Sequence, residues 1–399
     1  MCNPEICFNV NAQSIEESNL FLRKLYELLS GYGNLGWLFD SYREKGSTRI
    51  HIGTINAGEV SIDYEEKGAL KNIYFSTTPD NFMFINECLK KAKQTYRSSL
   101  EKYTVQVGFV NHSSPSCADK ASADKALKVE KVAYNNILCD YNESAKTIDL
   151  TFSVDAFGDF DLQYIVTQKV NYLRLLLSLY SNSIFKTFAI KCAKGEFKCL
   201  DIVVSDYKKD WIDTSDTYSS YSTIRFAPEF FQLFSRVLSD SHYDRTIRLI
   251  LNSAQQLYCA QLMKRDAFID PCHFIPGYID LINTTLVSAL EPISNINAPK
   301  AEVCSECGQP KYSIRKKVKE LCEKYVPNLS KYIVDTLYAE RSAYLHEGNA
   351  KTNEFYCGHC VPLLDPNDGK SFLIPVSTIN FNMFEYVSFI IRKVIEENL

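Results

Sequence analysis

The chain has 399 residues, of which 46% are hydrophobic and 23% charged, and its formal net charge is -4. This composition is typical of globular proteins with a sizeable core, and it excludes a disordered chain and a fibre. No apolar run approaches the roughly 18 residues that a membrane span needs, and the start, MCNPEICFNV, lacks the features of a signal peptide. We therefore expect a cytoplasmic protein of two domains with no membrane partner.

In the first half of the chain, short runs of β-branched and aromatic residues alternate with helical patterns. Strands are expected over 49–55, 59–64, 103–110, 147–157, 184–192 and 197–206. Helices are expected over 15–30, 81–98 and 160–181, where apolar residues recur three and four positions apart. These elements predict a mixed α+β domain over residues 1–224. No phosphate-binding loop, dinucleotide fingerprint or acidic metal cluster stands in its sequence, so its ligand is not predicted.

The polar segment 205–223 lacks apolar periodicity and is expected to connect two domains. Beyond residue 224, strand patterns give way to segments with apolar residues on one helical face. These segments are 228–240, 243–263, 276–294, 313–326, 329–348 and 381–398. We predict an all-α helical bundle over residues 225–399, so the whole chain is expected to be of the α+β class.

Fourteen cysteines are scattered along the chain, a pattern that indicates free, buried or metal-bound thiols rather than a disulfide framework. Two pairs of them have C-x2-C spacing, which lets both sulfurs of a pair reach one ion. These four are Cys304, Cys307, Cys357 and Cys360. They predict a closed structural Zn²⁺ site that joins the loop before Ser313 to the loop after His346. His359, inside the second pair, is expected to be a bystander.

The helix expected over 329–348 carries Arg341-Ser-Ala-Tyr-Leu-His346, an arginine and a histidine five positions apart, before a capping Gly348. The two residues are either a catalytic pair or ordinary polar residues of a surface helix. On an ideal helix they lie about 140° apart. They can meet at one point if the last turn loosens or if a second chain supplies the partner. A similar pair, Arg236 and His242, lies on an early helix.

With this motif, the following Glu347-Gly348 and the final amphipathic helix, residues 225–399 resemble the HEPN superfamily, in particular its Apea-like branch. The resemblance implies metal-independent endoribonuclease activity with Arg341 and His346 as catalytic residues. It also implies a homodimer in which two motifs meet, and cleavage that leaves 2',3'-cyclic phosphate ends. The chemistry suits these residues, because an imidazole transfers protons near neutral pH and a guanidinium neutralises phosphoryl oxygens. No catalytic metal is expected.

The segment KYSIRKKVK contains five cations and no acid. They are Lys311, Arg315, Lys316, Lys317 and Lys319. They are either a contact for RNA phosphates or a solvated helix face.

Three functions stay open at this point. The first is a ribonuclease of prokaryotic anti-phage defence or of toxin type, whose first domain senses a phage-derived or nucleotide trigger. The second is a non-catalytic HEPN binding or assembly module. The third is a zinc-dependent regulator that binds nucleic acid.

Overall fold

The protein is represented by a computed structural model. It describes residues 4–31, 36, 38, 40–43, 48–56, 58–64, 69–112, 128–202, 223–224, 226, 228–239, 244–269, 278–297, 314–347, 363–364, 372–373 and 383–399. No helix in these ranges is long and apolar enough to cross a membrane.

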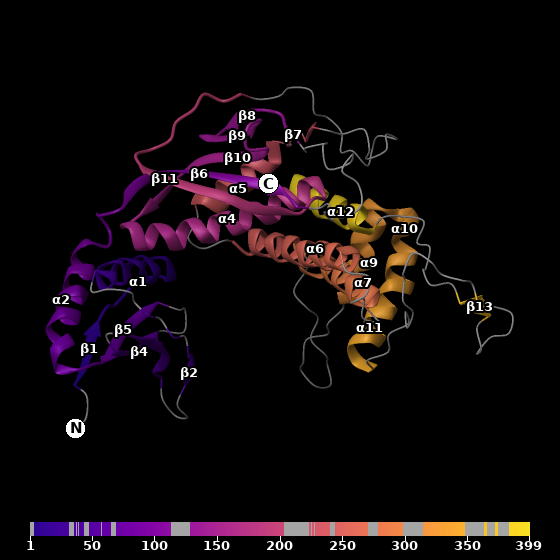
Figure 1. The fold of residues 1–399 in the computed structure, drawn as a ribbon. Coiled ribbons are helices and arrows are strands. Elements are labelled where there is room, and N and C mark those ends of the chain that lie inside the picture. Colours follow the sequence, from indigo (N-terminus) through magenta and orange to yellow (C-terminus); the bar gives the residue numbers. More distant parts are fainter. Residues whose placement is uncertain are drawn as a thin grey trace.

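The first unit of the fold is an antiparallel sheet of order β1-β5-β4-β3-β2 with two helices packed on it (Figure 1). Its strands are β1 (Glu5–Asn9), β2 (Tyr42–Arg43), β3 (Ile50–Ile55), β4 (Gly58–Tyr64) and β5 (Leu70–Ser76). Its helices are α1 (Ile15–Ser30) and α2 (Pro79–Thr95). The fully buried side chains of Phe21, Leu25, Ile73, Phe75 and Ile85 form its core, because each element turns its apolar positions inward.

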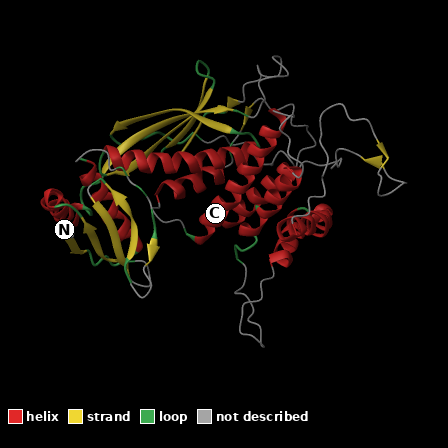
Figure 2. Ribbon diagram, turned by 60° about the horizontal axis from the view of Figure 1, so that its bottom comes forward, coloured by secondary structure: helices red, strands yellow, loops and turns green. Residues whose placement is uncertain are grey.

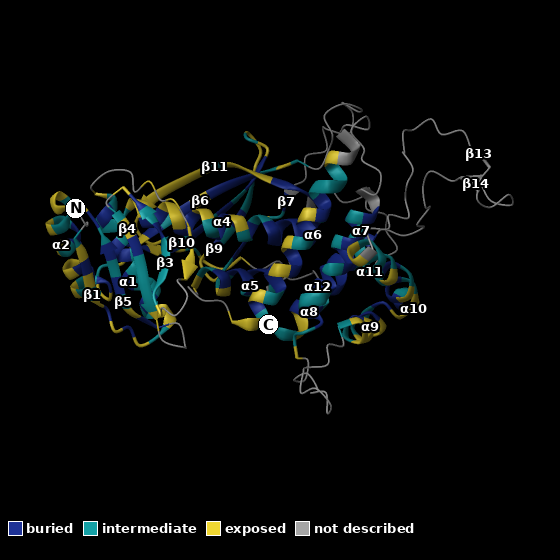
Figure 3. Cartoon of the chain, turned by 90° about the horizontal axis from the view of Figure 1, so that it is seen from below, coloured by how far each residue is buried: buried dark blue, intermediate teal, exposed yellow. Residues whose placement is uncertain are grey.

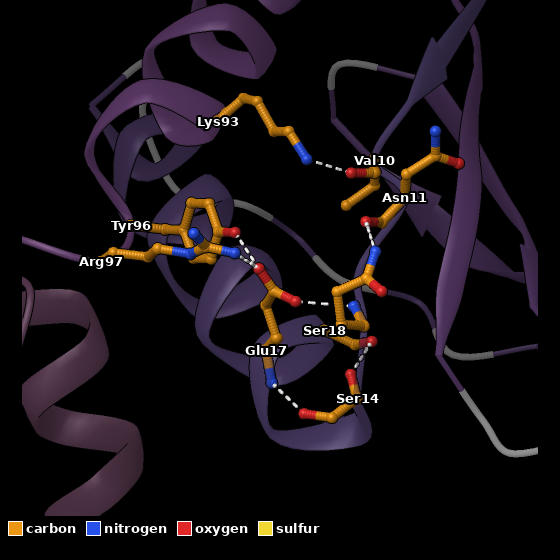
Figure 4. Close-up of polar contacts among 9 residues, drawn as sticks. Val10, Asn11, Ser14, Glu17, Ser18, Lys93, Tyr96 and Arg97 are labelled. Atoms are coloured by element: carbon orange, nitrogen blue, oxygen red, sulfur yellow. Dashed lines mark hydrogen bonds and ion pairs between the residues drawn. The ribbon is translucent and has the colours of Figure 1, made fainter.

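Glu17 joins α1 to the end of α2 (Figure 4). Its carboxylate accepts hydrogen bonds from the Tyr96 hydroxyl, the Arg97 guanidinium and the backbone N–H of Gln13. Burial raises the pKa of the Glu17 carboxyl, but the hydrogen bonds and the charge of Arg97 outweigh it and lower this pKa to about 2. Ser14 caps the same helix by accepting from the Glu17 N–H.

A second antiparallel sheet has the order β11-β6-β10-β9-β8, and a long helix, α4 (Asp159–Ser181), runs along one face of it (Figures 1 and 2). The strands are β6 (Glu101–Asn111), β8 (Val132–Tyr134), β9 (Ile137–Asn142), β10 (Thr147–Ala156) and β11 (Phe185–Lys194). Asn135 and Asn136 form the tight turn between β8 and β9, and both have positive φ angles, as a two-residue hairpin requires. The short strands β7 (Lys128–Val129) and β12 (Thr223–Ile224) pair in parallel beside it.

The rest of the described chain is almost entirely helical. It contains α5 (Pro228–Ser239), α6 (Arg245–Ile269), α7 (Tyr278–Ser288), α8 (Leu290–Ile293), α9 (Ile314–Tyr325), α10 (Pro327–Lys331), a π-helical segment (Tyr332–Leu337), α11 (Tyr338–Glu347) and α12 (Met383–Asn398). Helix α6 packs against α4, α7 and α12. The helices therefore form one assembly with the second sheet, and buried residues lie where these elements pack together (Figure 3).

One hydrophobic cluster extends from Tyr103 on β6 to Ile395 on α12. At its centre α5 meets the second sheet, where the ring of Phe234 stands edge-on against Phe152 of β10 with centroids 5.4 Å apart. The buried Arg392 of α12 donates to the backbone oxygen of Leu179 on α4. Residues before and after position 224 thus share one core. The predicted division at residue 224 stays a prediction.

The mixed α+β class and the mainly helical second half are confirmed. The predicted helices over 15–30, 81–98 and 160–181 and the strands over 49–55 and 147–157 match α1, α2, α4, β3 and β10 within a few residues. The structure corrects two expectations. They concern a strand over 197–206 and the absence of strands beyond 224, whereas the predicted helix over 329–348 is present as successive α- and π-helical turns from Pro327 to Glu347.

The missing strand after β11 has a local cause. Gly195 has a φ of +120° and turns the chain out of β11, and Leu200 beyond it is 89% exposed, so residues 197–201 form no ladder. A single bridge joins Ile202 to Ala133, and residues 203–206 lie outside the described ranges. Beyond residue 224 a two-residue pair, Leu363–Leu364 with Phe372–Leu373, forms a small ladder. The helix over 329–348 contains the π-helical segment.

Candidate functional site

Helix α11 carries both residues of the predicted catalytic pair. It is α-helical from Tyr338 to Glu347 and follows directly on the π-helical segment, where the Tyr338 N–H donates to the oxygen of Ile333, five residues back. Wider turns of this kind recur at functional sites in proteins. The predicted cap, Gly348, lies outside the described residues.

Arg341 is held by two groups on neighbouring elements. Its Nε donates to Oγ of Ser288 at the end of α7, and its Nη2 donates to Oε2 of Glu291 on α8, each at 3.0 Å. The Arg341 and Glu291 side chains are 17% and 20% exposed, so their ion pair is well shielded from water. A planar guanidinium with contacts at Nε and Nη2 has one fixed orientation.

Tyr338 completes this network from the first turn of α11. Its hydroxyl donates to Oε1 of Glu291 at 2.9 Å, so both carboxylate oxygens of Glu291 hold a group of α11. Burial and the Glu291 carboxylate raise the pKa of Tyr338 to about 12, and the phenol therefore remains a donor at neutral pH. The Arg341 guanidinium also lies 5.3 Å from the Tyr338 ring centroid. We call Ser288, Glu291, Tyr338 and Arg341 the Arg341 network.

His346 stands apart from this network. It is exposed in the last turn of α11, next to Leu345, whose side chain is 52% exposed. The helix keeps α-geometry through Glu347, so the last turn does not loosen, and residues 341 and 346 lie about 140° apart around its axis. Arg341 faces α7 and α8, and His346 faces a different side. A loosened last turn, one of the two ways in which Arg341 and His346 could share a site, is therefore not present.

The four cysteines of the predicted zinc site, Cys304, Cys307, Cys357 and Cys360, lie outside the described residues, as does His359. Within the described ranges no group of three or more His, Cys, Asp or Glu side chains is placed to hold a metal ion. Seven other cysteines are described and have free thiols, namely Cys7, Cys88, Cys139, Cys192, Cys199, Cys259 and Cys322. The zinc site stays a prediction that rests on the four-thiolate donor set.

Four cations of the basic segment, Arg315, Lys316, Lys317 and Lys319, lie on α9, whereas Lys311 lies outside the described residues. Arg315 pairs with Asp335 of the π-helical segment at 3.2 Å, and Lys317 donates to Oδ1 of Asn295 at 2.9 Å. Two further pairs, Lys316 with Glu320 and Lys319 with Glu323, are 3.9 and 3.8 Å long within the helix. These exposed pairs contribute little and break easily, so the face is accessible but not uniformly positive.

Arg315 connects this face to the Arg341 network. Its partner Asp335 lies one turn before Tyr338. The charge of Arg315 acts on the Tyr338 phenol together with that of Arg341. Two residues of the network were missed by sequence analysis, because Ser288 on α7 and Glu291 on α8 lie about fifty positions upstream of Arg341. Nothing in their local sequence indicates a partner on α11. Of the other Arg-His pair only Arg236 is described, and its Nη1 lies 3.9 Å from Oδ2 of Asp244, whereas His242 lies outside the described residues.

Comparison with known proteins adds no assignment. No protein-family profile matches the chain, and no similar curated protein or solved structure was found.

Proposed function

We propose that the protein is a metal-independent endoribonuclease of the HEPN type, in which Arg341 and His346 are the catalytic residues. The observation that supports this proposal best is the Arg341 network. It fixes a guanidinium on the helix that exposes a histidine in its last turn. Fixed orientation of a charged group is what stabilisation of a transition state requires.

The proposed reaction is intramolecular transesterification of RNA. The 2'-oxygen attacks the adjacent phosphorus as its proton passes to a base, and the bond to the 5'-oxygen breaks as that oxygen takes up a proton. The products are a 2',3'-cyclic phosphate and a 5'-hydroxyl. His346 supplies a proton-transfer group, and Arg341 supplies hydrogen-bond donors for the negatively charged phosphoryl oxygens.

The contacts of Arg341 leave donors for a phosphate. A guanidinium has five N–H groups, of which the described contacts to Ser288 and Glu291 use two. Glu291 compensates the charge of Arg341, so the neighbouring cations of α9, Arg315 foremost, would contribute the attraction for RNA. Lys316, Lys317 and Lys319 belong to the same proposed RNA-binding segment, with Lys311 preceding it.

A homodimer is the simplest way to join the two catalytic residues. In one chain the helix directs them to different sides, and the exposed Leu345 beside His346 offers an apolar contact for a partner. We propose that each site uses Arg341 of one chain and His346 of the partner chain. The four cysteines would bind a structural Zn²⁺ that holds the loops at the two ends of this region, and a closed four-thiolate site takes no part in the reaction.

A second candidate function rests on the same ion pair. A shielded Arg-Glu pair can also hold two helices together, and in a non-catalytic HEPN-like module this would be the only role of Arg341. The first unit of the chain would sense the trigger in either case. In the ribonuclease reading we propose a role in prokaryotic anti-phage defence or as a toxin-like enzyme.

The test is incubation of the purified protein with total RNA during brief exposure to EDTA, followed by sequencing of the cleaved ends. We expect cleavage with 2',3'-cyclic phosphate ends, lost in Arg341→Ala and in His346→Ala. The matched control is Arg236→Ala, which removes an exposed arginine from another helix. Cleavage that persists in both variants, or no cleavage of total RNA by the unchanged protein, would overturn the proposal.

A further inference from the structure

A large cavity separates the first unit of the fold from the second sheet and the helices. Its volume is about 1240 Å³, and its wall is formed by α1, α4, β10 and the β8–β9 turn, with α5 and the first turn of α6 at one end. Binding sites for small molecules are typically concave and about 300–1,000 Å³ in volume, so this cavity has room for a ligand of nucleotide size. It lies away from the Arg341 network, none of whose residues lines it.

One face of α4 provides the most regular part of the wall. Phe160, Tyr164, Gln168 and Tyr172 recur at intervals of four residues, and all four line the cavity. Residues at this spacing lie one above the other along a helix. An aromatic stripe on a helix usually belongs to a core, but Phe160 is 38% and Tyr164 57% exposed, so their rings face open space. Three rings and an amide along one line suit a planar ligand that stacks and hydrogen-bonds.

The acidic side chains of the wall gather near β10 and are already paired. Asp161 is 2% exposed and accepts both contacts from Arg23, at 2.8 and 2.7 Å. Asp155 and Glu196 lie 3.9 and 3.1 Å from the ammonium of Lys102. With two cations, Arg23 and Lys102, against these three carboxylates, this end of the cavity has a small negative excess and offers polar groups without a net attraction for an anion.

The other end of the cavity is positive. Lys169 is buried in the wall and donates to the backbone oxygen of Val237, at the end of α5. Arg248 is exposed in the first turn of α6, and within the described part of the chain no carboxylate lies within ion-pair distance of it. Asp244, one turn before Arg248, accepts from the Ile247 N–H and lies 3.9 Å from Arg236, and it does not line the cavity. A guanidinium so placed matches a phosphate group.

We propose that this cavity binds a nucleotide. The base stacks on the rings of Phe160 and Tyr164, where Gln168 and the amides of the β8–β9 turn can reach its polar edges, and the phosphates lie toward Lys169 and Arg248. The site lies outside the proposed ribonuclease centre and does not depend on it. Because α1 contributes to one wall and α5 and α6 to another, a bound nucleotide holds the first unit against the rest of the chain. The stabilisation follows from binding to the folded state alone.

The test is titration of the full chain with ATP, GTP, CTP and UTP, each followed by calorimetry and by thermal unfolding. We expect at least one to bind and to raise the unfolding temperature. Tyr164→Ala should weaken this binding about tenfold, since loss of one stacking ring has effects of this size, and Arg248→Ala should do so by a similar factor.

Matched controls separate the cavity from the surface. Arg245→Ala removes an exposed arginine of the same turn of α6 that does not line the cavity, and Phe188→Ala removes a 64% exposed ring from β11. Both should bind as the unchanged protein does. Binding must also persist in Arg341→Ala, which distinguishes this site from the ribonuclease centre. No binding of any of the four nucleotides, or an affinity in Tyr164→Ala and Arg248→Ala equal to that of the unchanged protein, would overturn the proposal.

Discussion

Arg341 of α11 and Glu291 of α8 form an ion pair, with Nη2 and Oε2 3.0 Å apart, and the same carboxylate also accepts from Tyr338. One side chain thus fixes two groups of the helix that carries the candidate catalytic pair. Glu291 is accordingly a positioning residue in the proposed ribonuclease, and its effects can be separated from those of Arg341.

Replacement of Glu291 by Gln keeps an acceptor for Arg341 but removes the charge that holds it. We expect the free energy of unfolding to fall by about 1–3 kcal/mol, because the shielded guanidinium loses its counter-charge. RNA cleavage should fall mainly in kcat, and Arg341→Lys should not retain activity, because an ammonium cannot span Ser288 and Glu291 as the guanidinium does. Chemical denaturation and steady-state kinetics measure the two effects. Full activity in Arg341→Lys would contradict the requirement for a guanidinium that contacts both Ser288 and Glu291.

His346→Ala should leave the fold unchanged, since the side chain is exposed, and the free energy of unfolding should change by no more than about 0.5 kcal/mol. Cleavage should nevertheless be lost. In dimers that contain one His346→Ala and one Arg341→Ala chain, the proposed shared site predicts that one of the two sites keeps both catalytic residues. These mixed dimers should recover activity that neither variant has alone. Tandem-tag purification and a cleavage assay test this, and failure to recover activity would argue for a site within one chain.

The Glu17 carboxyl links pH to stability in the first unit. Its pKa of about 2 in the folded protein lies below the usual value of 4.5, so the ionised form contributes stability above about pH 4.5. This contribution, at most about 3 kcal/mol, decreases as the pH falls from about 4.5 toward 2. Glu17→Gln should remove this part of the pH dependence. Denaturation of both proteins between pH 2 and 7 checks it, and parallel curves would show that Glu17 does not contribute.

Asp161 is buried, and Arg23 supplies its charged partner from the first unit. Arg23→Ala leaves this carboxylate without a counter-charge and should destabilise the protein by about 3 kcal/mol. The control is Arg49→Ala, because Arg49 pairs with Glu5 where both side chains are more than a third exposed, and the cost there should stay below about 1 kcal/mol. Thermal unfolding measures both changes. Equal effects of the two substitutions would contradict the difference in burial.

The predicted zinc site is tested by Cys304→Ser and Cys357→Ser. A closed four-thiolate site couples metal binding to folding, so we expect zinc content and unfolding temperature to fall together. Cys259→Ser replaces an exposed free thiol and should change neither. Metal analysis of the unchanged protein should give one zinc per chain, and a value far below one would exclude the site.

Sequence patterns predicted the long elements well and the relations between them poorly. The helix over 160–181 and the strand over 147–157 are long enough for their periodicity to define them, and the structure contains both. The contact of Phe234 with Phe152 joins segments that periodicity treats independently, so a shared core across residue 224 was not predicted. In the candidate site, the motif located Arg341 and His346. Ser288 and Glu291 became visible only when α7 and α8 packed against α11.

The number of residues in the π-helical segment from Tyr332 to Leu337 determines which way the side chains of α11 face. A wide turn accommodates one residue more than an α-helical turn does. Deletion of a single residue there would restore α-helical spacing, and α11 would keep its direction because the wide turn had absorbed the extra residue. Insertion of one more residue would instead turn α11 by about 100° relative to α10, as in any helix. Arg341 would then face away from Glu291, although every residue of the network would still be present. Insertion of one codon within 332–337 is therefore expected to inactivate the proposed ribonuclease as completely as replacement of Arg341, whereas loss of one codon there is not.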